Sequence, residues 1–282
     1  MTTLTAATAA PTRPGAATRL TFPRVARAEW IKAATLRSTY WTIGVSVAFV
    51  LLFAAGIVFA VTLAPPADVP DPAAVITENY GATPSLGVIG FAFMFVYSLV
   101  AIFGVLVVGP ERSFGLLATT LAAVPRRTPV LAAKLLVSAV VGVVTGLVGA
   151  VASFLIVQPQ LAGLGMGSSI ADPDVLQVLA GGVVFLGLVA VLSTAIGSLF
   201  RSTAAGLGAV LGLLLAAPAI VPIIPGVGGW IAGFLPSTAG MMLFQSASEV
   251  GWQPIVTGGL VLLGWTVGAT VLAGVLFTRR DV

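Results

Sequence analysis

Six long gaps separate the charged residues of this chain, and the lengths of these gaps constrain its fold more than any other feature. Only 8% of the 282 residues are charged, whereas a soluble domain usually carries roughly a quarter. A helix needs about 20 apolar residues to cross a hydrocarbon core of ~30 Å, and each gap is long enough for one. We therefore predict an all-α integral membrane protein with six transmembrane helices, over Trp41–Leu63, Leu86–Val108, Val130–Val157, Val175–Phe200, Thr203–Ile224 and Ile255–Phe277.

The loops between the predicted helices alternate in charge. All 13 Lys and Arg residues lie in the N-terminal arm, around the loops after the second and fourth helices, or at the C-terminus. The other loops contain no Lys or Arg, and they carry Asp68, Asp71, Glu78, Asp172, Asp174 and Glu249. Because basic loops stay in the cytosol, we predict that both termini are cytosolic. An odd number of helices would break this segregation, so the helix count and the orientation support each other.

The first residues differ in composition from the rest of the chain. Residues 1–22 are rich in Thr, Ala and Pro and contain no apolar run, so we predict a disordered cytosolic tail. Residues 23–282 then form one six-helix transmembrane domain. We expect no cleavable signal peptide, because the first apolar stretch begins after Tyr40 and is long enough to span the membrane.

Several classes of function are disfavoured by residues that the chain lacks. It contains no Cys and no His, which removes thiolate and imidazole metal sites, Cys or His nucleophile pairs and the usual proton relay. No ionisable residue falls in the middle of a predicted span, and Lys134 lies near a helix end, where we expect it to snorkel to the interface. This pattern argues against proton-coupled carriers, voltage sensors and intramembrane aspartyl proteases. We expect no enzyme, no cofactor and no nucleic-acid partner.

ATP binding by a P-loop is also disfavoured. The chain has only two lysines, Lys32 and Lys134, and neither follows a G-x-x-x-x-G pattern. If ATP hydrolysis drives this protein, we expect ATP to bind to another polypeptide.

Glycine and proline positions predict how the helices pack and where one of them ends. Gly142 with Gly146, Gly208 with Gly212, and Gly264 with Gly268 have the spacing that lets helices approach closely. We favour packing inside the bundle over a dimer contact for these pairs. Pro218, Pro222 and Pro225 predict the end of the fifth helix. We expect the following stretch, Gly226–Gln253, to form a re-entrant or interfacial hairpin on the outer side before the last helix.

Two cytosolic segments are candidates for a function. The first, Pro23–Trp41, is predicted to be helical, with Trp30, Tyr40 and Trp41 as anchors at the lipid headgroups. It is either an interfacial anchor or a helix that binds a partner. The second, Glu111–Lys134, contains a short amphipathic helix that Ser113 can cap and Pro125 ends. This helix is either a lever between two spans or a helix that lies on lipid headgroups.

These segments resemble the permease subunits of type-2, exporter-class ATP-binding-cassette (ABC) transporters, in particular those of high-GC Gram-positive bacteria. The resemblance is carried by the sequences ARAEWIKAATLRSTYW, ERSFGLLATTLAAVPRRTPVLAAK, FLPSTAG and the terminal TRRDV. It covers nearly the whole chain from Arg24 onward. One departure is Ser113 followed by Phe114, where many members have small or basic residues.

The resemblance implies a permease that works as a dimer in the bacterial cell membrane, with a second permease copy or a paralogue and with a cytosolic ABC ATPase subunit that binds ATP. In that family the helix between the second and third spans is the coupling helix that docks on the ATPase. Carried over by resemblance, the ATPase-coupling residues are Glu111, Arg112, Gly115, Arg126 and Arg127.

A competing hypothesis for the function and several details stay open. A non-transporting anchor, sensor or immunity protein with the same architecture is the competing hypothesis. The sequence does not distinguish among amphipathic drugs, lipids and peptides as cargo, and it does not distinguish a homodimer from a heterodimer.

Overall fold

The chain is an all-helical, multi-pass membrane protein. A computed structural model describes residues 21–63, 74, 77–79, 84–113, 127–163 and 165–279, and these residues contain no strand. Six helical segments in this described part are long and apolar enough to cross a membrane, which confirms the predicted number. The five that run as straight helices are α2 (Arg37–Leu63), α4 (Pro84–Leu106), α7 (Arg127–Ala162), α8 (Pro173–Gly197) and α14 (Trp252–Arg279). The sixth, Thr203–Ile223, is broken.

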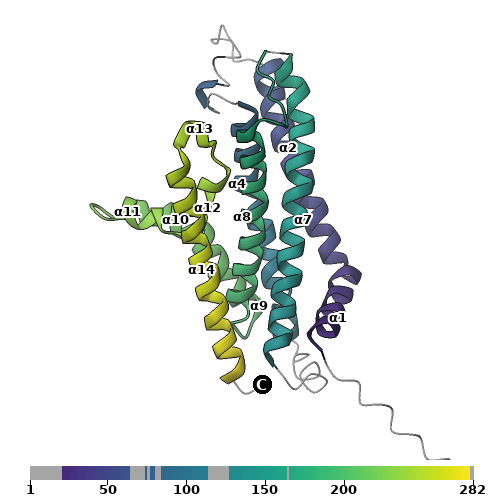
Figure 1. Cartoon of the computed structure of the whole chain (residues 1–282). Coiled ribbons are helices and arrows are strands. Elements are labelled where there is room, and N and C mark those ends of the chain that lie inside the picture. Colours follow the sequence, from purple (N-terminus) through teal and green to yellow (C-terminus); the bar gives the residue numbers. More distant parts are fainter. Residues whose placement is uncertain are drawn as a thin grey trace, which may run out of the picture.

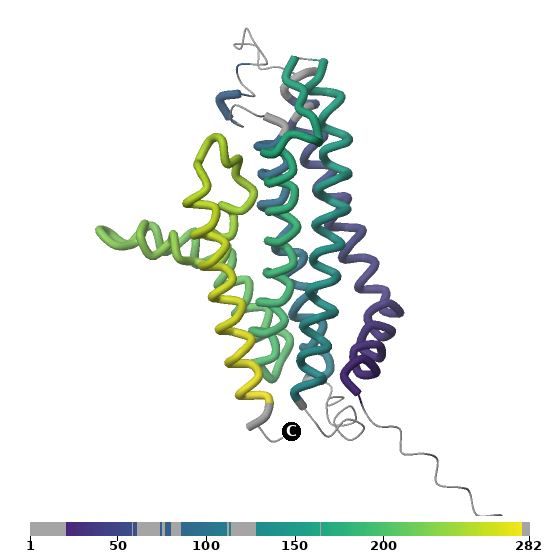
Figure 2. Tube along the Cα trace, viewed as in Figure 1, coloured from purple at the N-terminus to yellow at the C-terminus, as the bar shows by residue number. Residues whose placement is uncertain are grey.

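The straight helices pack as an upright bundle around α8 (Figures 1 and 2). α8 contacts α4, α7 and α14. In the most apolar 18-residue stretch of α8, 61% is buried inside the protein, whereas the same stretch of α2 is only 17% buried. A helix this rich in apolar residues on all sides is expected at the centre of a bundle. The amphipathic α1 (Phe22–Thr35) precedes α2 and packs on the basic end of α7.

The predicted lead-in helix Pro23–Trp41 is not continuous, and this prediction is corrected. The backbone of Leu36 is extended, with φ −77° and ψ 124°, and this residue separates α1 from α2. Tyr40 and Trp41 therefore belong to the first transmembrane helix, whereas Trp30 belongs to α1.

Glycines bring the central helices into close contact, but not at every predicted pair. A Cβ added at Gly142 would lie 2.6 Å from the Leu186 carbonyl, and one at Gly146 would lie 2.9 Å from Val183. The first pair thus packs α7 against α8, as predicted. At the other two pairs, Gly208 with Gly212 and Gly264 with Gly268, an added Cβ would meet no other helix of the described chain within 4 Å. The prediction is wrong for them because their helices lie on the outside of the bundle.

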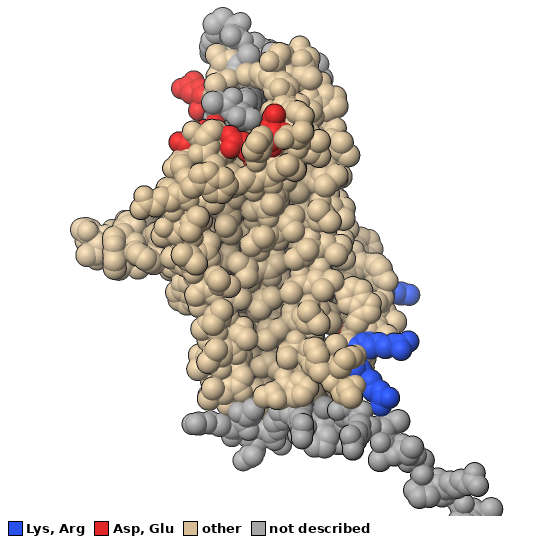
Figure 3. All heavy atoms as spheres, viewed as in Figure 1, with Lys and Arg blue, Asp and Glu red and all other residues tan. Residues whose placement is uncertain are grey.

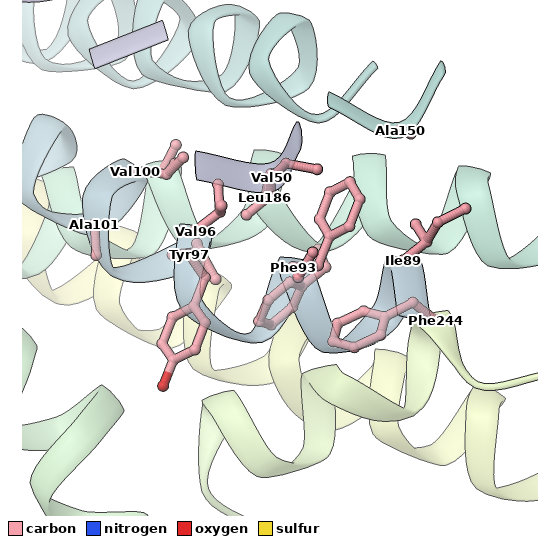
Figure 4. Packing of buried hydrophobic residues seen from close by; sticks show 14 of the residues in the cluster. Val50, Ile89, Phe93, Val96, Tyr97, Val100, Ala101, Ala150, Leu186 and Phe244 are labelled. Carbon is pink, nitrogen blue, oxygen red and sulfur yellow. The ribbon is translucent and has the colours of Figure 1, made fainter. Parts of the chain in front are cut away.

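An aromatic and aliphatic cluster fills the middle of the bundle (Figure 4). Phe93 and Phe244 are close to one another there, with ring centroids 6.3 Å apart, and Phe244 makes an edge contact with Phe185 at 5.3 Å. Nearer the basic end, the Thr194 hydroxyl lies 2.9 Å from the Gly104 carbonyl and 2.7 Å from the Ser138 hydroxyl. These contacts join α4, α7 and α8 by both packing and hydrogen bonds.

The described charges gather at the two ends of the bundle. In the face that Figure 3 shows, the visible acidic side chains lie at one end and the visible Lys and Arg side chains at the other, with an uncharged band between them. The charge alternation of the loops is therefore also seen in space, while Glu29 and Glu111 lie among the lysines at the basic end.

The fifth apolar segment turns sideways within this uncharged band. It begins at the basic end as α9 (Thr203–Leu211), passes through a π-helical turn, η1 (Gly212–Ala216), and leaves the bundle as α10 (Ala217–Ile220), η2 (Val221–Ile223) and α11 (Gly228–Gly233) (Figure 1). Pro218 has no N–H to donate to the Leu214 carbonyl four residues earlier. The Tyr97 hydroxyl of α4 donates to that carbonyl instead, at 3.0 Å in a buried position.

The segment after α11 differs from the predicted outer hairpin. The chain returns to the bundle and runs along α14 and α8 to the acidic end. This returning segment consists of α12 (Pro236–Met241), η3 (Met242–Phe244) and α13 (Ala247–Val250). Close contacts fix this return: an added Cβ at Gly258 would lie 2.2 Å from the Ala239 carbonyl, and one at Gly181 would lie 1.8 Å from the Leu243 carbonyl. The chain therefore runs from the basic end to the acidic end of the bundle in two parts, α9 and the segment α12 to α13, and projects sideways between them. The reason is that prolines end the first part before it reaches the acidic end.

Replacing Tyr97 by Phe tests this hydrogen bond. The Tyr97→Phe variant leaves the Leu214 carbonyl without its buried donor, so we expect a loss of about 1 kcal/mol of stability, seen as a lower melting temperature of the purified protein. Tyr40→Phe is the control, because Tyr40 donates to the Ala34 carbonyl at an exposed position. An equal effect of both substitutions would contradict a special role of Tyr97.

Candidate functional site

Four charged side chains form a closed ring of ion pairs at the basic end of the bundle. Lys32 Nζ lies 3.1 Å from Glu29 Oε1 and 2.5 Å from Glu111 Oε1. Lys134 Nζ lies 2.8 Å from Glu29 Oε2 and 2.8 Å from Glu111 Oε2, the second contact being an ion pair without good hydrogen-bond angles. Each lysine thus bridges both glutamates, and the two positive and two negative charges cancel. We call these four residues the ion-pair ring.

Three helices supply the ring, and local sequence sets each position. Glu29 and Lys32 are three residues apart on α1 and therefore share one face. The apolar residues Val25, Val130 and Ala133 pack α1 against α7, which brings that face to Lys134. α4 ends at Leu106, and a turn leads into the short α5 (Gly109–Ser113), which carries Glu111.

α5 is also tied to the broken fifth segment. The Ser113 hydroxyl lies 3.0 Å from the Thr203 hydroxyl and accepts a hydrogen bond from the Thr203 backbone N–H at 3.1 Å. Gly109 lets the two elements approach, since an added Cβ would lie 2.8 Å from Thr203 Oγ1. Five residues of α5 therefore connect α1 and α7 on one side to the start of α9 on the other.

Burial divides the ring into an inner and an outer part. The side chain of Lys134 is 1% exposed and those of Glu29 and Glu111 are 7% and 12% exposed, whereas that of Lys32 is 42% exposed. A buried ion needs a partner, because an unpaired charge in a low-dielectric interior costs several kcal/mol. Lys134 has two partners and also lies 3.5 Å from the Val107 carbonyl.

The surroundings of Lys32 raise its pKa above the ordinary value of 10.5. Partial burial alone would lower this pKa, since burial disfavours the charged form. The hydrogen bond to Glu111 and the negative charges of Glu29 and Glu111 outweigh that effect. Lys32 therefore stays positive over the physiological range.

A cavity of about 510 Å³ lies beside the ring, between α1 and the ends of α2 and α4. Glu29, Lys32 and Glu111 form one edge, and the remaining walls are mostly apolar, with Leu36, Phe103, Leu106, Val107 and Val137 among them.

The structure describes only part of the predicted coupling set. Glu111 points into the ring, so its carboxylate holds Lys32 and Lys134 rather than facing outward. Arg112 belongs to α5 and Arg127 begins α7, but their side chains are outside the described part. Gly115 and Arg126, with the predicted amphipathic helix, also lie outside the described residues.

Three ring residues were missed or misplaced by the sequence analysis. Lys134 does not snorkel as predicted, because its ammonium group is buried between two carboxylates. Glu29 and Lys32 were treated only as part of a lead-in helix. A signal was present: Glu29 and Glu111 are acidic residues on an otherwise basic side, and such residues need basic partners.

The predicted membrane anchors are exposed in the structure. Trp30 is 46% exposed on α1, and Tyr40 and Trp41 are 64% and 70% exposed on the first turns of α2. Their positions near the basic end agree with contact to lipid headgroups, which stays a prediction.

In the described part of the chain, no group of three or more His, Cys, Asp or Glu side chains is arranged to hold a metal ion. The acidic residues of the ring are already neutralised by the two lysines.

The sequence matches no protein-family model, and no curated protein matches it. A function for this chain must therefore be inferred from the geometry of the ring and from the sequence of the adjoining loop.

The ring can be tested by removing its most buried cation. Lys134→Met leaves two glutamates with one lysine, so we expect a loss of roughly 3–5 kcal/mol of stability. The double variant Glu29→Gln, Lys134→Met keeps the remaining Lys32–Glu111 pair neutral, and we expect it to melt at a higher temperature than Lys134→Met alone. Additive losses in thermal unfolding would contradict a coupled ring.

Lys32 also predicts a dependence on alkaline pH. Its folded-state pKa is raised, so its contribution to stability is fully present below about pH 10.5 and is lost as the pH rises through the folded-state value. We expect the melting temperature of the wild-type chain to fall in that range and that of Lys32→Met to fall less. Identical alkaline profiles would show that Lys32 does not stabilise the ring.

Proposed function

We propose that this chain is the membrane-spanning permease subunit of an ATP-driven ABC exporter in the bacterial cell membrane. Its basic end faces the cytosol, where a separate ATPase subunit binds. A second permease subunit completes the translocation path, and membrane lipids surround the complex.

The observation that carries this proposal is the anchoring of α5. This helix precedes the loop whose sequence resembles a coupling helix; its Glu111 pairs with lysines of α1 and α7, and its Ser113 is hydrogen-bonded to Thr203 of α9. A loop that merely lies on lipid headgroups would need no such connections. A loop that transmits force needs a rigid link to the helices that it moves.

The geometry suggests how a push on the loop would spread through the bundle. A displacement of α5 acts on α1 and α7 through Glu111 and on the fifth segment through the Ser113–Thr203 hydrogen bonds. The neutral ring allows its members to move together without exposing an unpaired charge.

The positions of the two lysines support a motor on another polypeptide. Both Lys32 and Lys134 are bound within the ring, so neither is placed to hold a nucleotide phosphate. The free energy for transport would then arrive as a mechanical displacement at the loop.

Copurification tests the proposal. We would purify the tagged chain in mild detergent and identify its partners by mass spectrometry, beside the variant Arg126→Glu, Arg127→Glu. We expect a P-loop ATPase with the wild-type chain and its loss, by roughly tenfold or more, from this variant, because reversed charges repel the surface that the arginines contact. The control is Arg201→Glu, which reverses an exposed arginine at the same end but outside both candidate segments.

The outcomes separate the alternatives. No ATPase with any form of the chain would overturn the exporter proposal. An ATPase that binds all three forms equally would place its contact elsewhere than the loop. If the ATPase binds but sealed vesicles containing both proteins and ATP move no amphipathic drug, lipid or peptide, the chain is a non-transporting anchor, sensor or immunity protein.

A further inference from the structure

The cavity beside the ion-pair ring lies in the bend between α1 and α2. Its volume is about 510 Å³, and its walls come from α1, the start of α2, the end of α4, α5 and α7. The extended backbone of Leu36 separates the two helices, so α1 packs on α7 at the basic end while α2 enters the bundle (Figure 1). The volume lies within the range of ~300–1,000 Å³ that is typical of sites for one small molecule.

A buried hydroxyl group without a partner lines this cavity. Thr39 is 6% exposed, and its Oγ1 forms no hydrogen bond within the described part of the chain. Buried polar groups are nearly always hydrogen-bonded, because an unpaired one is costly to keep away from water. A hydroxyl can both donate and accept, so Thr39 can bind either kind of polar group in the cavity.

Lys32 offers a second polar contact at the edge of the same cavity. An ammonium group has three N–H donors. Among the described residues, the partners of Lys32 Nζ are Glu29 Oε1 and Glu111 Oε1, which leaves one donor for a ligand. The Lys32 side chain is 42% exposed, so this donor is accessible.

The remaining walls of the cavity are mostly apolar. Phe103 and Val137 are each 3% exposed, and they line the cavity together with Leu36, Leu106 and Val107. A ligand must therefore place an apolar body against these side chains and a polar head near Thr39 and Lys32. This combination defines an amphipathic molecule.

The ion-pair ring restricts the charge of that polar head. The ring contains two carboxylates and two ammonium groups, and their formal charges cancel. A charged head would lose its hydration and would find no unpaired opposite charge to compensate for the loss. An uncharged head that accepts a hydrogen bond avoids this cost.

We propose that the cavity binds one uncharged single-chain lipid of the monoacylglycerol class. Its head is hydrogen-bonded to Lys32 and Thr39, and its acyl chain lies against Phe103. The membrane is the source, because the cavity adjoins the first turns of α2, where Tyr40 and Trp41 are exposed at the predicted level of the headgroups. One chain supplies all the walls, so the inference rests neither on a second subunit nor on the ATPase.

Photo-crosslinking in nanodiscs tests this site. The purified chain, in nanodiscs of zwitterionic phospholipid, receives a monoacylglycerol with a diazirine in its acyl chain, and mass spectrometry maps the labelled residues. We expect label on Phe103, Leu106 or Val137, and its displacement by unlabelled monoolein. Oleyl sulfate and oleyltrimethylammonium carry fixed charges on the same chain, and we expect them to displace the label at least tenfold less effectively.

Two variants and a matched control separate binding from stability. Thr39→Val keeps the shape of the side chain, and we expect labelling to fall at least fivefold while the melting temperature without lipid does not fall, because an unpaired hydroxyl is removed. Ala33→Leu enlarges a lining residue of α1, and we expect it to block labelling. The control is Ser46→Ala, which removes another buried, unpaired hydroxyl of α2 outside the lining of the cavity and should leave labelling unchanged.

Four results would overturn the inference. They are an absence of label from the cavity walls, equal displacement by the charged competitors, normal labelling of Thr39→Val and Ala33→Leu, and an equal loss in Ser46→Ala. The assay contains no ATPase, so a failed lipid site changes the labelling and a failed exporter proposal changes the copurification.

Discussion

A membrane interior offers no water to polar groups, and the architecture of this protein depends on that constraint. Straight helices satisfy their own backbone, so five of the apolar segments form a bundle without further help. At two places where the chain departs from this pattern, a specific partner compensates. Tyr97 donates to the carbonyl that Pro218 leaves without a donor, and Lys134 is neutralised by two glutamates.

The ion-pair ring shows why a charged cluster can be useful where an apolar one would be more stable. Buried ion pairs often contribute less to stability than well-packed apolar residues of the same volume. What the ring adds is a link between elements that are distant in sequence: each lysine must remain near both glutamates for the charges to cancel. α1, α5 and α7 are therefore held in register at the end of the bundle where force is proposed to enter.

Much of the fold could be predicted from the sequence, because the relevant signals are local. Charge-free gaps predicted the six spans, and the prolines predicted the end of the fifth at Ile224, one residue beyond its end at Ile223 in the structure. The position along the bundle at which the fifth segment turns sideways could not be predicted. It depends on the close packing of the returning segment against Gly181 of α8 and Gly258 of α14. The ring could not be predicted either, since residues 29, 111 and 134 meet only after α1 has packed on α7. The acidic residues Glu29 and Glu111 on the basic side were the available clue.

The burial of Lys134 has a consequence for how the protein responds to its ionic surroundings. Dissolved ions screen exposed charges beyond about 8 Å at physiological ionic strength, but they reach buried pairs much less. With its lysine 1% exposed, the inner part of the ring is shielded from such screening. Concentrated salt would therefore loosen contacts made by surface arginines while the link among α1, α5 and α7 stays intact. A salt wash would therefore release a partner held by arginines of the basic end and leave the linkage among the three helices in place.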